Sequence, residues 1–187
     1  MQTSTVQATE LLRELGAEII PHPGGTLLAH LDRVRARLAT WGARPALQLA
    51  GLCHAFYGTD GFPETLLPLD RRAELVEIIG TEAEAIVHAY ASCDRKATYP
   101  HFADPASALH DRFTGDAHTP PSRLRRDFAE LTAANELDLA RLDPAFRDRY
   151  GPDLLTLFSR FRPWLSEPAW EDCRAVLGSR PGATRQE

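Results

Sequence analysis

Residues 46–58 read ALQLAGLCHAFYG and form the most apolar of the helical segments in the chain. Leu49, Ala50 and Cys53 belong to a set of apolar residues that covers most faces of a helix over about 44–57. A helix that is apolar on most faces belongs in the middle of a core, where neighbouring elements cover it. This stretch therefore predicts a helical bundle around residues 44–57, with a histidine, His54, at the end of its central helix.

Helical spacing continues on both sides of this segment. Leu27 and Leu31 begin an inward stripe that Thr26 can cap, and Thr81 with Glu84 has the spacing of a capping box. We expect helices over about 4–16, 27–41, 44–57, 70–79, 81–93, 122–141, 152–162 and 166–177. Because no stretch reads as a convincing strand pair, the predicted fold class is all-α, a single-domain helical bundle.

The length of 187 residues favours one domain, which we place at 1–178. Residues 179–187 lack an apolar anchor, so we expect a disordered tail there. The last two helices are rich in aromatic residues that fit either the core or a second subunit, and a homodimer therefore stays open: Phe158, Phe161, Trp164 and Trp170.

Charge and cysteine content restrict the function classes. Acidic residues outnumber basic ones, 26 to 21, which argues against a nucleic-acid partner. No apolar run approaches the ~20 residues of a membrane span, and the N-terminal residues lack a signal core. The three cysteines, Cys53, Cys93 and Cys173, are odd in number and far apart, which is typical of reduced thiols. We therefore expect a cytoplasmic protein that acts on a small molecule.

Three side chains stand where a polar residue is costly. His30 lies in the inward half of its predicted helix, His54 ends the most apolar helix, and Asp94 follows an apolar stripe. A buried imidazole needs a partner for each ring nitrogen, and a metal with a carboxylate or carbonyl supplies both. Two imidazoles and one carboxylate suit a divalent metal ion such as iron, manganese or zinc. The alternative is two hydrogen-bonded core histidines and an aspartate paired with an arginine.

Three segments carry a resemblance to a known family. HLDRV from His30, LAGLCHAFYG at 49–58 and ASCDR at 91–95 resemble the metal-binding segments of HD-domain proteins. The resemblance covers roughly residues 20–140 and implies a helical bundle with the metal between helices. In that family an aspartate follows the second histidine, whereas this chain has Ala55, which argues against a two-metal site. His22, in the turn-rich PHPGG, is a candidate fourth ligand or else an exposed turn histidine.

Other residues are candidates for contacts with a substrate. Tyr57 follows His54 closely and can hydrogen-bond a ligand near a metal, while Arg95 and Lys96 follow Asp94 and can hold an anion. For these residues the alternative is a solvated face.

Two further features lie later in the chain. Asn135 stands among apolar helix neighbours and needs hydrogen bonds, and Glu136 or Asp138 is a possible base or else a helix-surface acid. Residues 95–119 mix proline, histidine and aromatics without periodicity, so we expect an irregular segment that acts as a lid.

Three functions fit these observations. The first is a metal-dependent hydrolase in which metal-activated water attacks a small anionic substrate such as a phosphoester. The second is a mononuclear non-haem iron oxygenase with a 2-His-1-carboxylate site. The third is a non-catalytic ligand-binding protein on an HD-like scaffold that has lost its activity.

Overall fold

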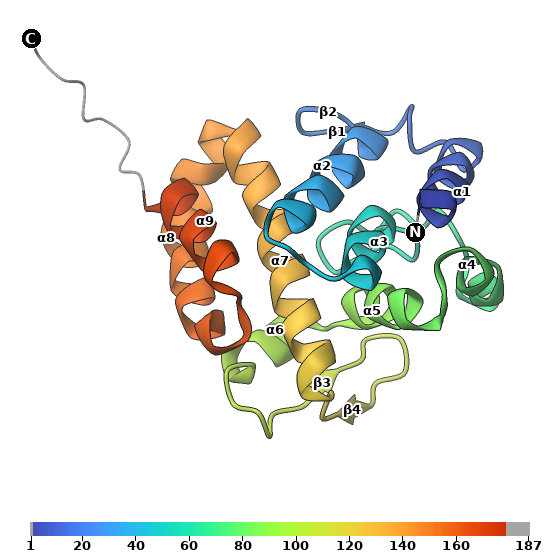
Figure 1. The fold of residues 1–187 in the computed structure, drawn as a ribbon. Helices are drawn as coiled ribbons and strands as arrows, with labels where there is room; N and C mark the ends of the chain where they lie inside the picture. The colour runs from blue at the N-terminus through green and yellow to red at the C-terminus, as the bar shows by residue number, and fades with distance from the viewer. Residues whose placement is uncertain (1, 179–187) are drawn as a thin grey trace, which may run out of the picture.

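Helix α7, Ser122–Leu142, runs through the centre of the molecule, as Figure 1 shows. It is buried on several faces because other helices pack on both of its sides: α2, α3, α5, α8 and α9. The computed structural model describes residues 2–178. Within that range the helices are α1 (Gln2–Glu14), α2 (Leu27–Thr40), α3 (Pro45–Cys53), α4 (Arg72–Ile79), α5 (Thr81–Ser92), α6 (Arg95–Thr98), α7, α8 (Pro144–Phe161) and α9 (Glu167–Leu177). Short 3₁₀ helices cover Leu69–Arg71, Tyr99–His101 and Arg162–Trp164.

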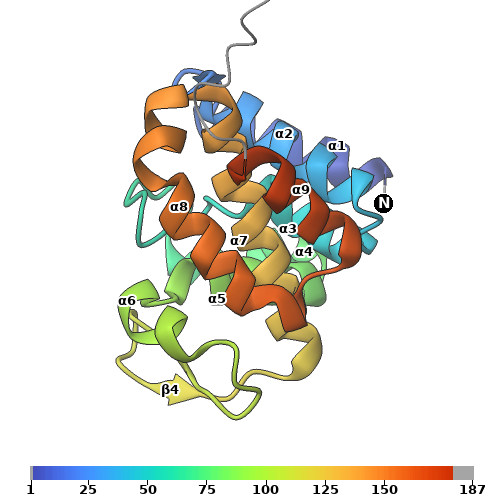
Figure 2. The same cartoon turned by 90° about the vertical axis from the view of Figure 1, so that its left-hand side faces the viewer.

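The helices form two groups on either side of α7. Helices α1 to α5 lie on one side, and α8 with α9 lies on the other (Figures 1 and 2). The apolar stretch at 46–58 is largely buried, with Ala50, Leu52 and Cys53 fully covered. The all-α, single-domain bundle is therefore confirmed. The C-terminal aromatics Phe158 and Phe161 are buried within the chain itself.

The structure contains two short antiparallel strand pairs, which the sequence analysis did not predict. Strand β1, Pro21–His22, pairs with β2, Gly25–Thr26, and β3, Leu109–His110, pairs with β4, Ala117–His118. The β1–β2 turn needs positive φ angles, 78° at Gly24 and 133° at Gly25, which glycine adopts without steric cost. This tight hairpin holds His22 in place where a flexible turn was expected.

Three local features also differ from the prediction. Helix α3 ends at Cys53 rather than near residue 57, and His54 is its C-cap. Thr81 and Glu84 make no capping box; Gly80 is the N-cap, and Glu84 is buried in an ion pair instead. Residues 95–119 are less irregular than expected, since they contain α6, a 3₁₀ helix and the β3–β4 pair. The predicted tail, 179–187, lies outside the described residues.

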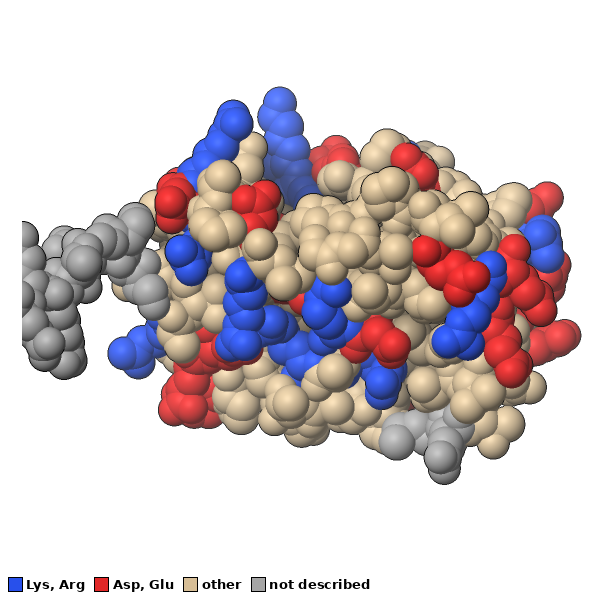
Figure 3. Space-filling model, turned by 90° about the horizontal axis from the view of Figure 1, so that it is seen from above, with Lys and Arg blue, Asp and Glu red and all other residues tan. Residues whose placement is uncertain are grey.

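The surface and the cysteines complete the description. Among residues 2–178, no helix is long and apolar enough to cross a membrane. The three cysteines are buried free thiols. Figure 3, which views the molecule from above, shows basic and acidic side chains interspersed on that face rather than gathered by sign. Ion pairs across this bundle include those that Asp172 makes with Arg37 and Arg141.

Candidate functional site

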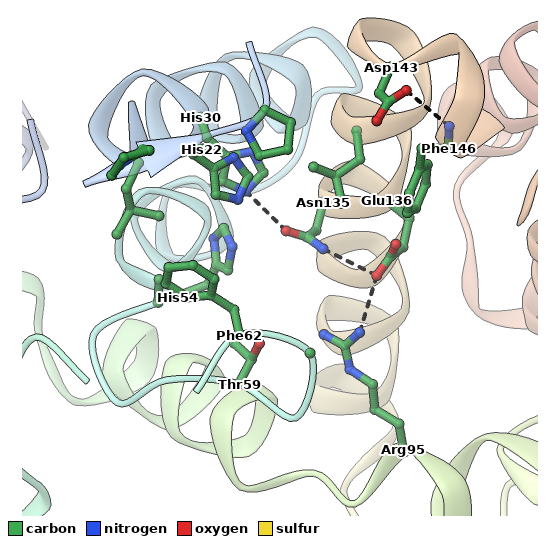
Figure 4. A pocket seen from close by; sticks show the side chains of 16 residues that line it. His22, His30, His54, Thr59, Phe62, Arg95, Asn135, Glu136, Asp143 and Phe146 are labelled. Atoms are coloured by element: carbon green, nitrogen blue, oxygen red, sulfur yellow. Dashed lines mark hydrogen bonds and ion pairs between the residues drawn. The ribbon is translucent and has the colours of Figure 1, made fainter. Parts of the chain in front are cut away.

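A cavity of about 410 Å³, which we call the histidine pocket, lies between the β1–β2 hairpin, α2, the end of α3, α7 and the start of α8. It is lined by Pro21, His22, Pro23, Leu27, His30, His54, Ala55, Thr59, Gly61, Phe62, Arg95, Asn135, Glu136, Leu139, Asp143 and Phe146. Figure 4 shows the three histidines on one side and Asn135, Glu136 and Arg95 on the other. Residues more than 100 positions apart in the chain therefore face one another.

His30 is held by a carboxylate behind it. Its Nδ1 lies 2.7 Å from Oδ2 of Asp138, and both residues are almost fully buried. Arg33 donates to the same carboxylate from Nε, at 2.8 Å, and from a terminal nitrogen, at 2.9 Å. Burial alone would raise the pKa of Asp138, but hydrogen bonds from His30 and Arg33 lower it below its usual value. Because a charged carboxylate only accepts, the His30 Nδ1 carries a proton and donates it to Asp138.

The other nitrogen of His30 faces an acceptor. Its Nε2 lies 3.1 Å from Oδ1 of Asn135, while the Asn135 amide nitrogen donates to Oε1 of Glu136 at 3.2 Å. Glu136 therefore fixes the orientation of the amide, because its carboxylate cannot donate. The His30 Nε2 and the amide oxygen then meet as two acceptors unless a cation, either a proton or a metal ion, binds between them.

The His54 ring also has a nitrogen, Nε2, whose lone pair carries no proton. Its Nδ1 lies 2.8 Å from the Gly51 carbonyl oxygen, which can only accept, so the proton is on Nδ1 and Nε2 is bare. Burial, followed by the charge of His30, lowers the pKa of His54 to about 3. The Asn135 side chain also interacts with His54 and raises that pKa in part. The His30 and His54 ring centroids are 5.4 Å apart.

His22 covers the His30 ring. The two ring centroids are 4.1 Å apart and the planes are nearly parallel, because the β1–β2 hairpin folds over the start of α2. Burial and the nearby His30 lower the pKa of His22 to about 4. Its Nδ1 is buried, and no described residue hydrogen-bonds to it. The Pro23 backbone raises the pKa of this ring in part. A buried nitrogen without a partner is costly, so a ligand or a water molecule that hydrogen-bonds to it would stabilise the site.

The opposite wall carries charges of both signs. Arg95 donates to Glu136 at 3.2 Å and to the Tyr90 hydroxyl at 3.2 Å. Asp143 lines the pocket near Phe146, whose backbone amide it caps at 3.0 Å. Arg95 thus brings one positive charge, and Glu136 with Asp143 brings two negative charges. These charges sum to one negative charge, so the lining favours binding of a cation over binding of an anion.

Several predicted site residues lie elsewhere. Asp94 does not line the histidine pocket; its Oδ1 accepts from the Ala97 amide at 2.9 Å and caps α6. The Tyr57 hydroxyl donates to Glu84 at 3.0 Å, away from the pocket lining. Lys96 is exposed on α6. Of residues 95–119, the pocket lining includes Arg95 alone, so the structure gives no support to a lid made of that segment.

The pocket does bring together the remaining predictions: His22, His30, His54, Arg95 and Asn135. Asp138 and Glu136, which the sequence left open as a base or as helix-surface acids, are both buried. The signal was their position on the same helix as Asn135, among apolar residues such as Leu137 and Leu139.

Residues 2–178 hold no group of three or more His, Cys, Asp or Glu side chains arranged to bind a metal. An amide is not among those residue types, yet the α7 side chain that meets Nε2 of His30 is that of Asn135. The expected set of two histidines and Asp94 is therefore not assembled. The set that meets at the pocket is His30, His54 and the Asn135 oxygen.

One comparison with known proteins matched part of the chain. Residues 11–95 match the profile of a family described as a domain of unknown function (DUF6817). This match covers less than half of the chain; it includes the three pocket histidines and stops before α7 begins. Comparison with the curated proteins gave no match, and comparison with the solved structures gave none. The resemblance to HD-domain proteins stays a prediction.

Proposed function

We propose that this protein is a metal-dependent hydrolase that binds one divalent cation through His30, His54 and Asn135 and cleaves a small anionic substrate such as a phosphoester. One observation carries the proposal. Both buried imidazoles have an Nδ1 proton committed to a fixed acceptor, Asp138 or the Gly51 carbonyl, so whenever His30 is in its neutral form both Nε2 lone pairs are able to bind a cation. Metal-bound histidines typically donate their second ring nitrogen to a carboxylate or carbonyl in this way.

The donor atoms fit a divalent ion. The low pKa values of His54 and His22 keep these rings neutral at pH 7, as ligation requires. The Asn135 oxygen faces His30 with no proton of its own to donate. Imidazole nitrogen with amide or carboxylate oxygen suits zinc, iron or manganese. His22, whose Nδ1 lacks a partner among the described residues, is a further donor beside the site.

The charges in the pocket support an anionic substrate once the cation is present. Arg95, Glu136 and Asp143 leave an excess of one negative charge, which a divalent ion would convert to an excess of one positive charge. Arg95 is placed to orient the substrate anion from the wall opposite the histidines. A divalent cation supplies Lewis acidity and lowers the pKa of water bound to it.

Glu136 is the residue we propose as the general base. Both of its hydrogen bonds to other described side chains, from Asn135 and Arg95, end on Oε1. Oε2 therefore remains to take a proton from the attacking water, whose oxygen adds to the phosphorus of the ester. The bond to the leaving oxygen then breaks, and Oε2 returns the proton to that oxygen.

The oxygenase alternative has less support from the predicted ligand set than hydrolysis. It required a carboxylate beside two histidines, and Asp94 caps α6 instead. The third donor is the neutral amide of Asn135, which does not complete a 2-His-1-carboxylate triad. Hydrolysis needs only a Lewis-acidic cation and a base, and both are compatible with the pocket.

Metal content tests the proposed site. Wild-type protein purified without added metal, along with His30→Ala, His54→Ala and His88→Ala, would be measured by elemental mass spectrometry. We expect one divalent ion per chain in the wild type and none in the first two variants. His88 is a half-buried histidine outside the pocket lining, so His88→Ala is the matched control and should keep the ion. Full occupancy in His54→Ala would reject the site.

Activity separates the possible functions. The metal-loaded protein would be assayed with p-nitrophenyl phosphate and bis-p-nitrophenyl phosphate, and Glu136→Gln would test the base. Hydrolysis that falls at least ~100-fold in Glu136→Gln supports the proposal. Oxygen consumption without hydrolysis would favour the oxygenase, and bound metal with neither activity would favour a binding protein.

A further inference from the structure

A second cavity adjoins the histidine pocket, and we call it the α8 pocket. Its volume is about 360 Å³, and it is lined by Arg95, Tyr99, Glu136, Phe146, Tyr150, Asp153, Leu154 and Leu157. Three of these residues, Arg95, Glu136 and Phe146, also line the histidine pocket. The two cavities therefore meet at the Arg95–Glu136 ion pair and the Phe146 ring.

The α8 pocket is built to accept apolar groups. Helix α8 supplies Tyr150, Leu154 and Leu157 on one face, and Tyr99 and Phe146 add two more rings. Leu154 and Leu157 are only partly buried, and Tyr150 is 40% exposed. Apolar side chains that remain exposed around one cavity are typical of a ligand site, because a ligand would remove their surface from water.

The Tyr99 hydroxyl is a second sign of a missing ligand. Its oxygen is buried, and no described residue hydrogen-bonds to it. Burial raises the pKa of Tyr99 well above its usual value, so the group stays a donor at neutral pH. A buried donor without an acceptor costs free energy that packing of the ring against Phe128 and Phe161 has to offset.

We propose that the substrate is amphipathic, with its anionic head in the histidine pocket and an apolar chain or ring in the α8 pocket. This inference rests on the proposed function, because the head is the group on which the metal site would act. The Arg95–Glu136 contact is a single hydrogen bond of 3.2 Å rather than a bidentate pair, so the boundary between the cavities is weakly closed. Arg95 faces both cavities and marks where head and tail join.

A homologous series of ligands tests this division. Binding of methyl, propyl and hexyl phosphate to the metal-loaded protein would be measured by isothermal titration calorimetry. We expect affinity to rise about threefold to fourfold for each methylene that enters the α8 pocket. Equal affinity across the series, or no binding of hexyl phosphate, overturns the inference. Loss of metal in His54→Ala is a separate result, so failure of the metal site and failure of the tail pocket are distinguishable.

A matched pair of variants locates the tail. Leu157→Trp fills the α8 pocket, whereas Leu155→Trp places the same ring on the same helix beside a different cavity. We expect Leu157→Trp to abolish the dependence on chain length. Leu155→Trp should keep the full dependence. Chain-length dependence that survives in Leu157→Trp would place the tail elsewhere and overturn the inference.

Discussion

Two buried clusters of polar side chains differ in how their hydrogen bonds are satisfied. The first, which we call the glutamate cluster, consists of Tyr57, Arg72 and Glu84. Arg72 donates hydrogen bonds to both Glu84 oxygens at 2.7 and 2.8 Å, and the Tyr57 hydroxyl donates to Oε1 of Glu84. The histidine cluster comprises the three pocket histidines and Asn135. It leaves Nε2 of His30 facing an acceptor and Nδ1 of His22 without a partner among the described residues.

The difference separates structural from functional burial of polar groups. A buried network in which each donor meets an acceptor stabilises one packing arrangement and has no need of a ligand. A buried network with surplus acceptors around a cavity is stable only if a cation or a ligand completes it. The histidine cluster borders the pocket, whereas no member of the glutamate cluster lines it. Four predictions test this contrast, in order of decreasing effect.

The largest expected effect is on stability, in the glutamate cluster. Glu84→Ala leaves Arg72 and the Tyr57 hydroxyl without their shared acceptor, and should lower the free energy of unfolding by about 3 kcal/mol. Urea denaturation measures the loss. Glu74→Ala is the control, because Arg71 holds Glu74 in a similar bidentate pair at an exposed site, where solvent screens the two charges and little stability should be lost. Metal affinity should not change in either variant, and a loss of metal would mean that the two clusters are coupled.

The second effect is on metal affinity. Asp138→Asn keeps the shape of the side chain but removes the charge that fixes the His30 proton on Nδ1. The metal should therefore bind 10- to 100-fold more weakly, a loss of binding free energy of roughly 1.4 to 2.7 kcal/mol. Asp127→Asn is the control, since Asp127 is also buried on α7 and paired with Arg44 but touches no histidine. Competition with a fluorescent chelator gives both affinities. Equal values for the two variants would contradict a positioning role for Asp138.

The third effect is a pH dependence of stability in the metal-free protein. His54 has an unfolded pKa near 6.5 and a folded pKa of about 3, so between these values the unfolded chain binds a proton that the folded chain does not. Stability therefore falls as pH drops below about 6.5, and the contribution of His54 at pH 5 is a loss of about 2 kcal/mol. Urea unfolding in EDTA at several pH values measures it.

His54→Gln should reduce that pH dependence without abolishing it, because the lowered pKa values of His22 and His88 act in the same direction. Substitution of an exposed histidine, His101→Gln, should leave it unchanged. If wild type and His54→Gln lose stability in parallel, the His54 ring is not buried in its neutral form.

The smallest effect concerns the aspartate that was expected to bind metal. Asp94→Ala removes the N-cap of α6 and should cost about 1 kcal/mol of stability. Metal content should stay at the wild-type level, because Asp94 does not line the histidine pocket. Thermal melting with parallel metal analysis checks both. If the Asp94→Ala protein folds but is purified without metal, Asp94 is a metal ligand after all.

Much of the fold could be read from the sequence. The segment around residues 46–58 is apolar on most faces, and helical periodicity elsewhere is strong enough to predict the bundle. The two strand pairs escaped because each strand has only two residues, too few to show an alternating pattern. The true end of α3 at Cys53 escaped because apolar residues continue past it, through Ala55 to Tyr57.

The candidate site was predictable only in part. His30 and His54 were found because a histidine among inward-facing residues needs a reason to be there, and the same argument found Asn135. Asp94 does not line the pocket and caps α6 instead. A carboxylate at a helix boundary serves equally well as an N-cap, and local sequence does not separate that role from metal binding.

The amino-acid sequence by itself determined the helical class, the apolar centre and the histidines that cannot face water cheaply. Tertiary structure decided which third side chain meets them, since Asn135 lies more than 100 residues from His30 and approaches only when α7 packs against α2. The physical reason is the distance along the chain over which each interaction acts. Periodicity and caps act over a few residues, whereas ligand sets depend on how distant helices cross.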